Sequence, residues 1–237
     1  MPKISRRGFE ESDKRFFSAK EVTRLKKAKE EIEYLIDRDY KLDSVITFVS
    51  NRYQFSNRQR ECLKRVVCTS ISKSLRKEKR LPIENINQQI IHIDGFNLII
   101  TIEVALSKGT LIMGSDGNIR DLAGLRGTYK VIDKTIKALE LIGRCLDDNN
   151  CKKAIFYLDA PVSNSGSLKY EILESSKSWN TEVEVNLVNN ADMILEKLDN
   201  VVSSDAVIID KSRSYFNLSR EIIEKNIDEK KLIDLNE

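Results

Sequence analysis

Residues 88–103, QQIIHIDGFNLIITIE, decide the fold class of this sequence. The first half, with Ile90, Ile91 and Ile93, is typical of a buried strand, and the second half continues into an apolar helix. Between the halves stands a single aspartate, Asp94, followed by a glycine and, two residues later, by Asn97. A carboxylate in a dry core is costly unless a partner needs its charge. Asp94 therefore marks a candidate site at the end of a strand.

From this stretch onward, segments typical of strands alternate with segments typical of helices. The predicted strands are residues 89–94, 153–159, 181–188 and 200–205. The predicted helices are residues 98–109, 122–146, 168–176 and 219–225, with one more starting near residue 190. Asp116-Gly117 is typical of a hairpin turn. Such alternation predicts an α/β domain whose mainly parallel sheet has helices on both faces.

The first part of the chain shows helical periodicity over residues 9–80. We expect three helices, the third of which begins after Ser56 as its N-cap. The apolar side of that helix predicts a set of buried residues, which are Leu63, Val66, Val67, Ile71 and Leu75. A basic run that ends at Arg80, followed by Pro82, predicts the boundary. The expected domains are a small all-helical domain, residues 1–83, and an α/β domain, residues 84–237.

Composition limits the class of protein. The chain has 237 residues, 41% of them hydrophobic, and no apolar stretch long enough to span a bilayer. The N-terminus lacks the apolar centre of a signal peptide. We expect a soluble cytoplasmic protein that does not bind membranes, with its oligomeric state open and a homodimer one possibility. The four cysteines lack zinc-site spacing and are predicted to be buried free thiols, and one histidine argues against imidazole-based catalysis.

The net charge of +3 conceals an asymmetry, because residues 1–80 carry +10 and residues 81–237 carry −7. A basic first part suits a polyanion, and an acidic second part suits metal ions. The polar side of the third helix carries four cations predicted to bind nucleic acid: Arg58, Arg60, Lys64 and Arg65. A solvated helix face is the alternative reading of the same four residues.

Three predicted strands end in an acid: Asp94, Asp159 and Asp205. A fourth acid, Asp192, opens the helix after the third strand. Ligands of open parallel sheets bind beyond the carboxyl ends of the strands, so these carboxylates are expected to converge there. Convergent carboxylates repel one another, and Mg²⁺ or Mn²⁺ relieves that repulsion. Each acid taken singly is also explained as a helix cap or a turn residue.

Other residues are weaker candidates for this site. Asn97 is expected either to cap the following helix or to hold the water shell of a metal. Asp210 also ends an apolar run. Glu103 lies two turns along the first helix of the α/β domain, and a simply exposed side chain is the alternative.

Several motifs resemble those of PIN-like nucleases, in particular the NYN branch: IHIDGFNLI, FYLDAP, NNADMIL and VVSSDAVIID. The resemblance implies a three-layer α/β/α fold with a mainly parallel sheet and a carboxylate metal site. Transferred to this sequence, the implied metal-site and catalytic acids are Asp94, Asp159, Asp192 and Asp205, supported by Asn97 and Ser204. The acid that such nucleases carry in an intervening helix stays open among Glu103, Asp121 and Glu140, and Asp210 is a further candidate ligand.

The whole chain also resembles a narrower group of uncharacterised, mostly archaeal proteins. Two stretches carry this resemblance: RDYKLDSVITFVSNRYQFSNRQRECLKR, and IDGFNLIITIEVALSKGTLIMGSDGNIRDLAG. In that group a helical domain of unknown function precedes a PIN-like domain, as the boundary near Pro82 predicts here.

The expected function is a Mg²⁺- or Mn²⁺-dependent nuclease that cuts backbone phosphodiesters, with RNA favoured over DNA. Three cations near the acids are expected to hold the substrate phosphate: Arg120, Arg126 and Lys130. A catalytically silent nucleic-acid-binding module is the main alternative. A small-molecule phosphohydrolase with an aspartyl nucleophile usually has two acids one residue apart, which Asp94-Gly95-Phe96 lacks. A protein-interaction scaffold is the residual alternative.

Overall fold

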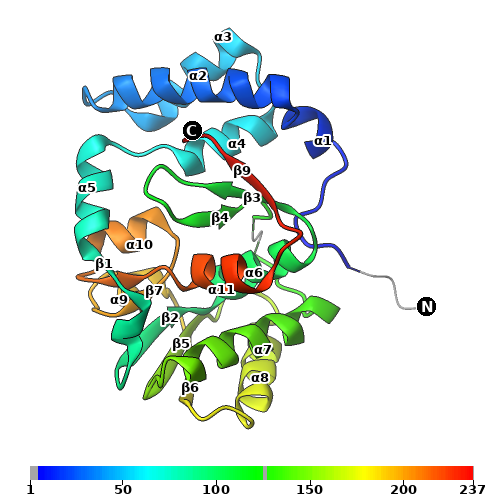
Figure 1. The fold of residues 1–237 in the computed structure, drawn as a ribbon, viewed down its shortest axis with the longest axis vertical. Helices are drawn as coiled ribbons and strands as arrows, with labels where there is room; N and C mark the ends of the chain where they lie inside the picture. Colours follow the sequence, from blue (N-terminus) through cyan, green and yellow to red (C-terminus); the bar gives the residue numbers. More distant parts are fainter. Residues whose placement is uncertain (1–4, 125–126, 237) are drawn as a thin grey trace.

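The computed structural model describes residues 5–124 and 127–236 of the chain. An all-helical part comes first and an α/β part follows, as expected (Figure 1). The helical part comprises α1 (Asp13–Phe16), α2 (Ala19–Ile36), α3 (Leu42–Tyr53), α4 (Asn57–Val66) and α5 (Ser70–Lys79). The helices of the α/β part are α6 (Gly95–Leu106), α7 (Asp133–Asp148), α8 (Ser165–Ser176), α9 (Asp192–Leu195), α10 (Ala206–Lys211) and α11 (Leu218–Asn226), with a 3₁₀ turn at Ile83–Ile86.

The main sheet has six strands, all of them parallel, in the order β1-β8-β7-β2-β5-β6. They are β1 (Arg80–Leu81), β2 (Ile90–Asp94), β5 (Lys153–Asp159), β6 (Glu182–Val188), β7 (Val201–Val202) and β8 (Tyr215–Phe216). The expected α/β class with a mainly parallel sheet is confirmed. The strand β2 lies between β7 and β5, so Asp94 is at the carboxyl edge in the middle of the sheet.

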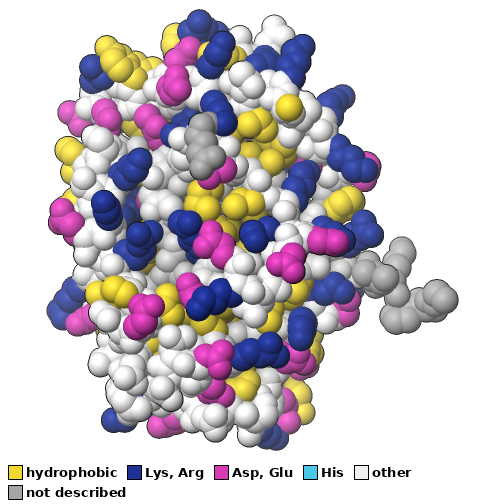
Figure 2. Space-filling view, viewed as in Figure 1, with side chains coloured by type: hydrophobic (Ala, Val, Ile, Leu, Met, Phe, Trp, Pro, Cys, Tyr) yellow, Lys and Arg dark blue, Asp and Glu magenta, His cyan; other side chains and the backbone are white. Residues whose placement is uncertain are grey.

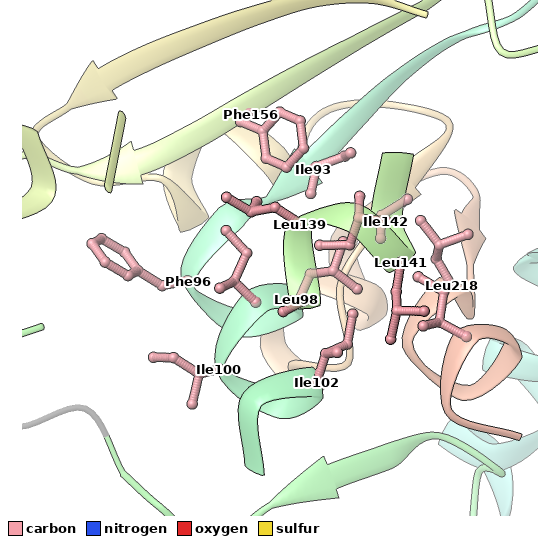
Figure 3. Close-up of a cluster of buried hydrophobic side chains, with 14 of the residues drawn as sticks. Ile93, Phe96, Leu98, Ile100, Ile102, Leu139, Leu141, Ile142, Phe156 and Leu218 are labelled. Carbon is pink, nitrogen blue, oxygen red and sulfur yellow. The ribbon is translucent and has the colours of Figure 1, made fainter. Parts of the chain in front are cut away.

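Helices cover both faces of this sheet. On one face, Ile93 of β2 and Phe156 of β5 pack against α6, α7 and α11 (Figure 3). On the other face, Val201 and Tyr215 pack against α9 and α10. The pattern follows from strand geometry, because alternate side chains point to opposite faces. The result is the expected three-layer arrangement, which leaves the carboxyl edge of the sheet open to a ligand.

A second, three-stranded sheet joins the helical part to the α/β part. It consists of β3 (Thr110–Met113), β4 (Ile119–Asp121) and β9 (Lys231–Asp234), in the order β4-β3-β9. Two of its residues, Ile112 and Ile233, belong to the apolar core of α2, α3 and α4 (Figure 1). The helical part thus completes its core with residues from the second part. The boundary at residue 83 stays a prediction.

Two predicted helices differ from the structure. The helix expected over 122–146 begins only at Asp133, because Gly124 and Gly127 take positive φ angles of 63° and 72°. The third helix of the first part is broken after Val66, and α5 starts afresh behind the N-cap Thr69. Ile71 and Leu75 were expected in the core; this is wrong, because after the break they are 71% and 48% exposed.

Other expectations, about a helix cap, the cysteines and the surface charge, are met in part. Ser56 caps α4 in a capping box with Gln59. All four cysteines are free thiols, and three of them are buried. On the face seen in Figure 2, Lys and Arg side chains alternate with Asp and Glu rather than gathering into one basic patch. None of the helices within the described residues is long and apolar enough to cross a membrane. Cytoplasmic location and a homodimer stay predictions.

Candidate functional site

Asp94 is the last residue of β2 and the N-cap of α6. Its Oδ1 accepts the backbone N–H of Asn97 at 3.3 Å, which satisfies one of the free donors of the helix start. The glycine between them has a packing reason, since a Cβ on Gly95 would lie 2.6 Å from Leu158 Cδ2 and 3.2 Å from the Tyr157 carbonyl. The Asp-Gly-x-Asn segment is therefore a tight strand-to-helix junction against β5.

The loop after β7 is bonded to this junction. Ser203 Oγ donates to Asp94 Oδ2 at 2.9 Å and accepts the backbone N–H of Asp205 at 3.0 Å. The side-chain oxygen of Asn97 accepts both the backbone N–H and the hydroxyl of Ser204, each at 2.9 Å. Asp205 in turn caps α10, accepting the N–H of Val207 at 2.7 Å. Asn97 and Ser204 thus bring Asp94 and Asp205 to one place.

The other two predicted acids lie beside this pair on the next strands. Asp159 ends β5, and its Oδ1 accepts the backbone N–H of Ala191 at 2.8 Å, just before α9 begins at Asp192. Partial desolvation, followed by the charges of Asp205 and Asp159, raises the pKa of Asp192. Burial raises the pKa of Asp94 to about 7, with smaller contributions from the charges of Asp192 and Asp205. The four acids share one electrostatic neighbourhood.

A cavity of about 580 Å³ opens beside these acids, between the helical part and the carboxyl edge of the sheet. Asp94 and Asp205 line it, whereas Asp159 and Asp192 are not among its lining residues. Its other charged residues include two acids, Asp121 of β4 and Glu61 of α4. Asp121 was one of three candidates for the intervening acid, whereas Glu61 carried no assigned role. The β3–β4 hairpin, whose turn at Asp116-Gly117 was expected from the sequence, brings Asp121 here.

Among the predicted nucleic-acid contacts, Lys64 and Arg65 line the cavity. Lys64 Nζ also lies 2.7 Å from Asp43, and Arg65 donates to the carbonyl of Asp121. Arg60 bonds within its own helical part, to the Phe55 carbonyl and Asn51.

The remaining predicted cations lie elsewhere or are used by the protein itself. Arg58 is largely buried, with its guanidinium bonded to Asp13 and to the carbonyls of Gly8 and Leu122, so it joins the two parts of the chain. Arg120 also lines the cavity, but it is buried and its guanidinium is used in contacts with Asp116 and two carbonyls. Lys130 is exposed and outside the cavity lining, and Arg126 is outside the described residues.

The two weaker acid candidates have structural partners. Asp210 forms a two-pronged ion pair with Arg76 of α5, at 2.6 and 2.7 Å. Glu103 is fully buried, so the alternative that it is simply exposed is wrong. Its carboxylate lies 2.5 Å from Arg7 Nε and accepts the Tyr129 hydroxyl at 2.6 Å. Neither residue lines the cavity.

The donor set suits a hard divalent cation in kind. The site offers carboxylate oxygens, which such an ion prefers. Burial, and to a smaller degree repulsion by the charges of Asp192 and Asp205, raises the pKa of Asp94. Within residues 5–124 and 127–236, however, no three or more His, Cys, Asp or Glu side chains are arranged to hold a metal ion. Mg²⁺ is commonly bound by one or two carboxylates, several waters and substrate phosphate, rather than by a closed protein cage. The residues present fit such an open site.

Comparison with known proteins places the chain in a family. A family model described as "Domain of unknown function (DUF5616)" matches residues 83–221, more than half of the chain. The chain belongs to this DUF5616 family. A second model, "Protein of unknown function (DUF434)", matches residues 24–79 of the helical part. The DUF5616 match contains the strand ends that carry Asp94, Asp159 and Asp205.

An uncharacterised protein from an archaeon is similar to this chain. "Uncharacterized protein MJ0935" of Methanocaldococcus jannaschii is 40% identical over 186 residues, which is 78% of this chain and 88% of the relative. No solved structure matches this member of the DUF5616 family. The expected kinship with uncharacterised archaeal proteins in which a helical region precedes an α/β domain is confirmed. The resemblance to PIN-like nucleases stays a prediction.

Proposed function

We propose that this protein is a Mg²⁺- or Mn²⁺-dependent nuclease that hydrolyses backbone phosphodiesters at the carboxyl edge of its parallel sheet. One observation carries the proposal: a cavity of about 580 Å³ is lined both by Asp94 and Asp205 and by Lys64 and Arg65. Carboxylates suit the metal and cations suit the phosphates of a substrate. The preference for RNA over DNA rests on the resemblance of the motifs to PIN-like nucleases.

The residues divide into three roles. Asp94 and Asp205 would hold the metal, with Asp159 and Asp192 adding negative charge at the neighbouring strand ends. When bound, such an ion lowers the pKa of a water molecule and polarises a phosphate oxygen. Asn97 keeps Asp94 and Asp205 together through its two bonds from Ser204. Lys64 and Arg65, on α4, would orient the phosphodiester from the side of the helical part.

The decisive experiment is an RNA cleavage assay with purified protein, Mn²⁺ and an end-labelled single strand. We expect Asp94→Asn to lower the cleavage rate by about 10³, the loss typical of removing a major electrostatic contribution to catalysis. Asp148→Asn is the matched control, because this exposed acid lies at the end of α7 and outside the cavity lining. Equal activity of the wild type and Asp94→Asn would exclude this mechanism, since a contaminating nuclease is unaffected by the variant.

A non-catalytic nucleic-acid-binding protein is the second candidate. It is favoured by the bonding of Asp94 and Asp205, which act as ordinary N-caps of α6 and α10. Under this function the protein binds RNA with a steep dependence on salt, cuts nothing in Mn²⁺, and Asp94→Asn leaves the affinity unchanged. Measuring affinity and cleavage on the same RNA separates the two candidates.

A further inference from the structure

Arg76, on α5 of the helical part, is buried and contacts two carboxylates of the α/β part. Its side chain is 6% exposed. Nη1 lies 2.6 Å from Asp116 Oδ2 in the β3–β4 turn, while Nε and Nη2 bond to Asp210 of α10 at 2.6 and 2.7 Å. These segments are 40 and 134 residues away in sequence. An arginine stays charged at all relevant pH values, so both ion pairs persist.

One connection runs from Arg76 to the site through Asp116. The same carboxylate holds Arg120 by two bonds, at 3.0 and 2.6 Å. Arg120 Nε donates to the carbonyl of Ser204 at 2.7 Å. Space here is tight, because a Cβ on Gly114 would lie 2.1 Å from Arg120 Nη1. Arg120 therefore has little freedom to leave the Ser204 carbonyl.

A second connection runs through α10. Asp210 lies near the end of this six-residue helix, and Asp205 is the N-cap at its start. Lys79 of α5 also donates to the Asp210 carbonyl at 2.6 Å. The end of α10 is thus bound to α5, while its beginning carries one of the cavity acids. A helix this short moves as a unit, so its position at Asp210 fixes its position at Asp205.

We propose that Arg76 is a positioning residue through which the helical part holds the Ser204–Asp205 loop at the acid site. The effect of Arg76 on catalysis rests on the proposed function, whereas its effect on the position of the Ser204–Asp205 loop does not. Ser204 is held from two sides. Asn97 accepts its N–H and its hydroxyl, and Arg120 donates to its carbonyl. Removing Arg76 takes one of the two arginines from Asp116, the carboxylate that orients Arg120, and at the same time removes the ion pair at the end of α10. The helical part is then a structural component of the site as well as a source of phosphate contacts.

A general loss of stability is the competing explanation, and Arg58 provides the control for it. Arg58 is also a largely buried arginine that joins the two parts, through Asp13 and the Leu122 carbonyl. It has no bond to the Ser203–Asp205 loop or to α10. A variant at Arg58 therefore weakens the contact between the helical and α/β parts but leaves the contacts from Arg76 to the Ser204–Asp205 loop unchanged.

Amide hydrogen exchange tests the placement without any assay of activity. In Arg76→Met, and to a smaller degree in Arg76→Lys, we expect the amides of Ser204, Asp205 and Val207 to exchange about tenfold faster than in the wild type. In Arg58→Met their rates should match the wild type. If these amides exchange equally in the Arg76 and Arg58 variants, Arg76 is only a stabilising residue and the proposal is wrong.

Catalysis supplies the second readout, and Asp210→Asn keeps it informative if Arg76→Met does not fold. Asp210→Asn leaves the Arg76–Asp116–Arg120 contacts in place and weakens the ion pair at the end of α10, while the Lys79 contact with the backbone carbonyl of residue 210 stays. We expect kcat for RNA to fall about tenfold with KM within about twofold, because the substrate cations are untouched. An unchanged kcat in both Asp210→Asn and Arg76→Lys would overturn the proposal. A wild type that cuts no RNA defeats the proposed function, while the exchange rates still decide the placement.

Discussion

Two sets of aspartates in this molecule have opposite surroundings. Asp13, Asp116 and Asp210, at the contact between the helical and α/β parts, each have an arginine within 2.9 Å. Within the described residues, the hydrogen-bond donors to Asp94 and Asp205, at the cavity, carry no charge. The pKa values of Asp116 and Asp94 follow this difference. Nearby Arg120 and Arg76 hold the pKa of Asp116 at about 2 against its desolvation, while burial raises that of Asp94 to about 7.

The contrast separates structural acids from functional candidates. A buried carboxylate with its own arginine has its charge compensated within the fold, and it needs nothing further. A buried carboxylate without a cation retains an electrostatic cost that an external cation can remove. Both sets consist of aspartates, and Asp94 and Asp210 each end an apolar run, so residue type and sequence context alone do not distinguish the sets. The presence or absence of a guanidinium partner does.

The largest expected effect tests the paired set. Asp116→Asn leaves Arg76 and Arg120 without their shared carboxylate in a buried place, so the free energy of unfolding should fall by about 3–5 kcal/mol. Urea unfolding at pH 7 measures it. The exposed pair Asp133–Lys134 supplies the control, because Asp133→Asn should change stability by less than about 0.5 kcal/mol. A loss below about 1 kcal/mol for Asp116→Asn would remove the distinction between the two sets.

The sequence was sufficient for the fold class and for part of the site. Alternation of strands and helices predicts the parallel sheet, and the rule that ligands bind at carboxyl ends then predicts that Asp94 and Asp205 meet. Because β2 and β7 are hydrogen-bonded neighbours, the two acids are brought together as expected. Asn97 and Ser204 are predicted by motif resemblance, and the structure shows the bonds between them.

What the sequence could not provide depends on contacts between distant segments. Arg58 and Arg65 lie on one helix and look alike in sequence, yet the carbonyls of Leu122 and Gly8 bury the first, while the second lines the cavity. The turn at Asp116-Gly117 was expected, but the cavity position of Asp121 depends on how the β3–β4 hairpin packs against α4 and α6, which the sequence pattern does not determine. Short strands such as β7 and β8 have two residues each, too few for any periodicity.

The next effect concerns the unpaired set and an added cation. Mn²⁺ at about 100 times its Kd should stabilise the wild type by about 2.7 kcal/mol, because an ion that binds only the folded state shifts the unfolding equilibrium. Asp94→Asn should lose most of this stabilisation, and Asp148→Asn should keep it. Thermal unfolding with Mn²⁺ or with a chelator measures the shift. An equal shift in the wild type and Asp94→Asn would place the ion away from Asp94.

Without metal, the same carboxylate should destabilise the fold in a defined range of pH. The pKa of Asp94 is about 7 in the folded protein against its ordinary value of 3.8, so the folded state binds the proton more tightly. Stability then falls as pH rises from about 4 to about 7, since the unfolded chain releases the proton first. At pH 8 with a chelator, Asp94→Asn should be more stable than the wild type by about 2 kcal/mol, after allowance for one lost hydrogen bond.

The pH profile provides the check on this result. The advantage of Asp94→Asn should shrink as pH falls below 7 and change sign before pH 4, because protonation removes the cost of the wild-type carboxylate and only the lost hydrogen bond of the variant remains. For Asp116 the dependence has the opposite sign, because its folded pKa of about 2 is below the ordinary value of 3.8. Its contribution is present above pH 4 and lost as pH falls toward 2. A difference between wild type and Asp94→Asn that is independent of pH would show that Asp94 is already compensated.

The smallest effect tests the cations on the opposite side of the cavity. Lys64 is exposed and forms an ion pair with the exposed Asp43, so Lys64→Ala should change stability by less than about 0.5 kcal/mol. If Lys64 contacts a phosphate, the variant should bind RNA more weakly and lower the slope of log affinity against log salt by about 1. Measuring it in the Asp94→Asn background prevents cleavage during titration.

Lys177 is the matched control for that measurement. It is likewise an exposed lysine in an ion pair, with Glu174 at the end of α8, and it does not line the cavity. Lys177→Ala should keep the affinity and the salt slope of its background. If both lysine variants reduce the slope equally, RNA binds by non-specific electrostatic attraction to the protein surface rather than at the cavity. A change confined to Lys64→Ala places a phosphate opposite the unpaired acids, which is the arrangement that a metal-dependent hydrolysis requires.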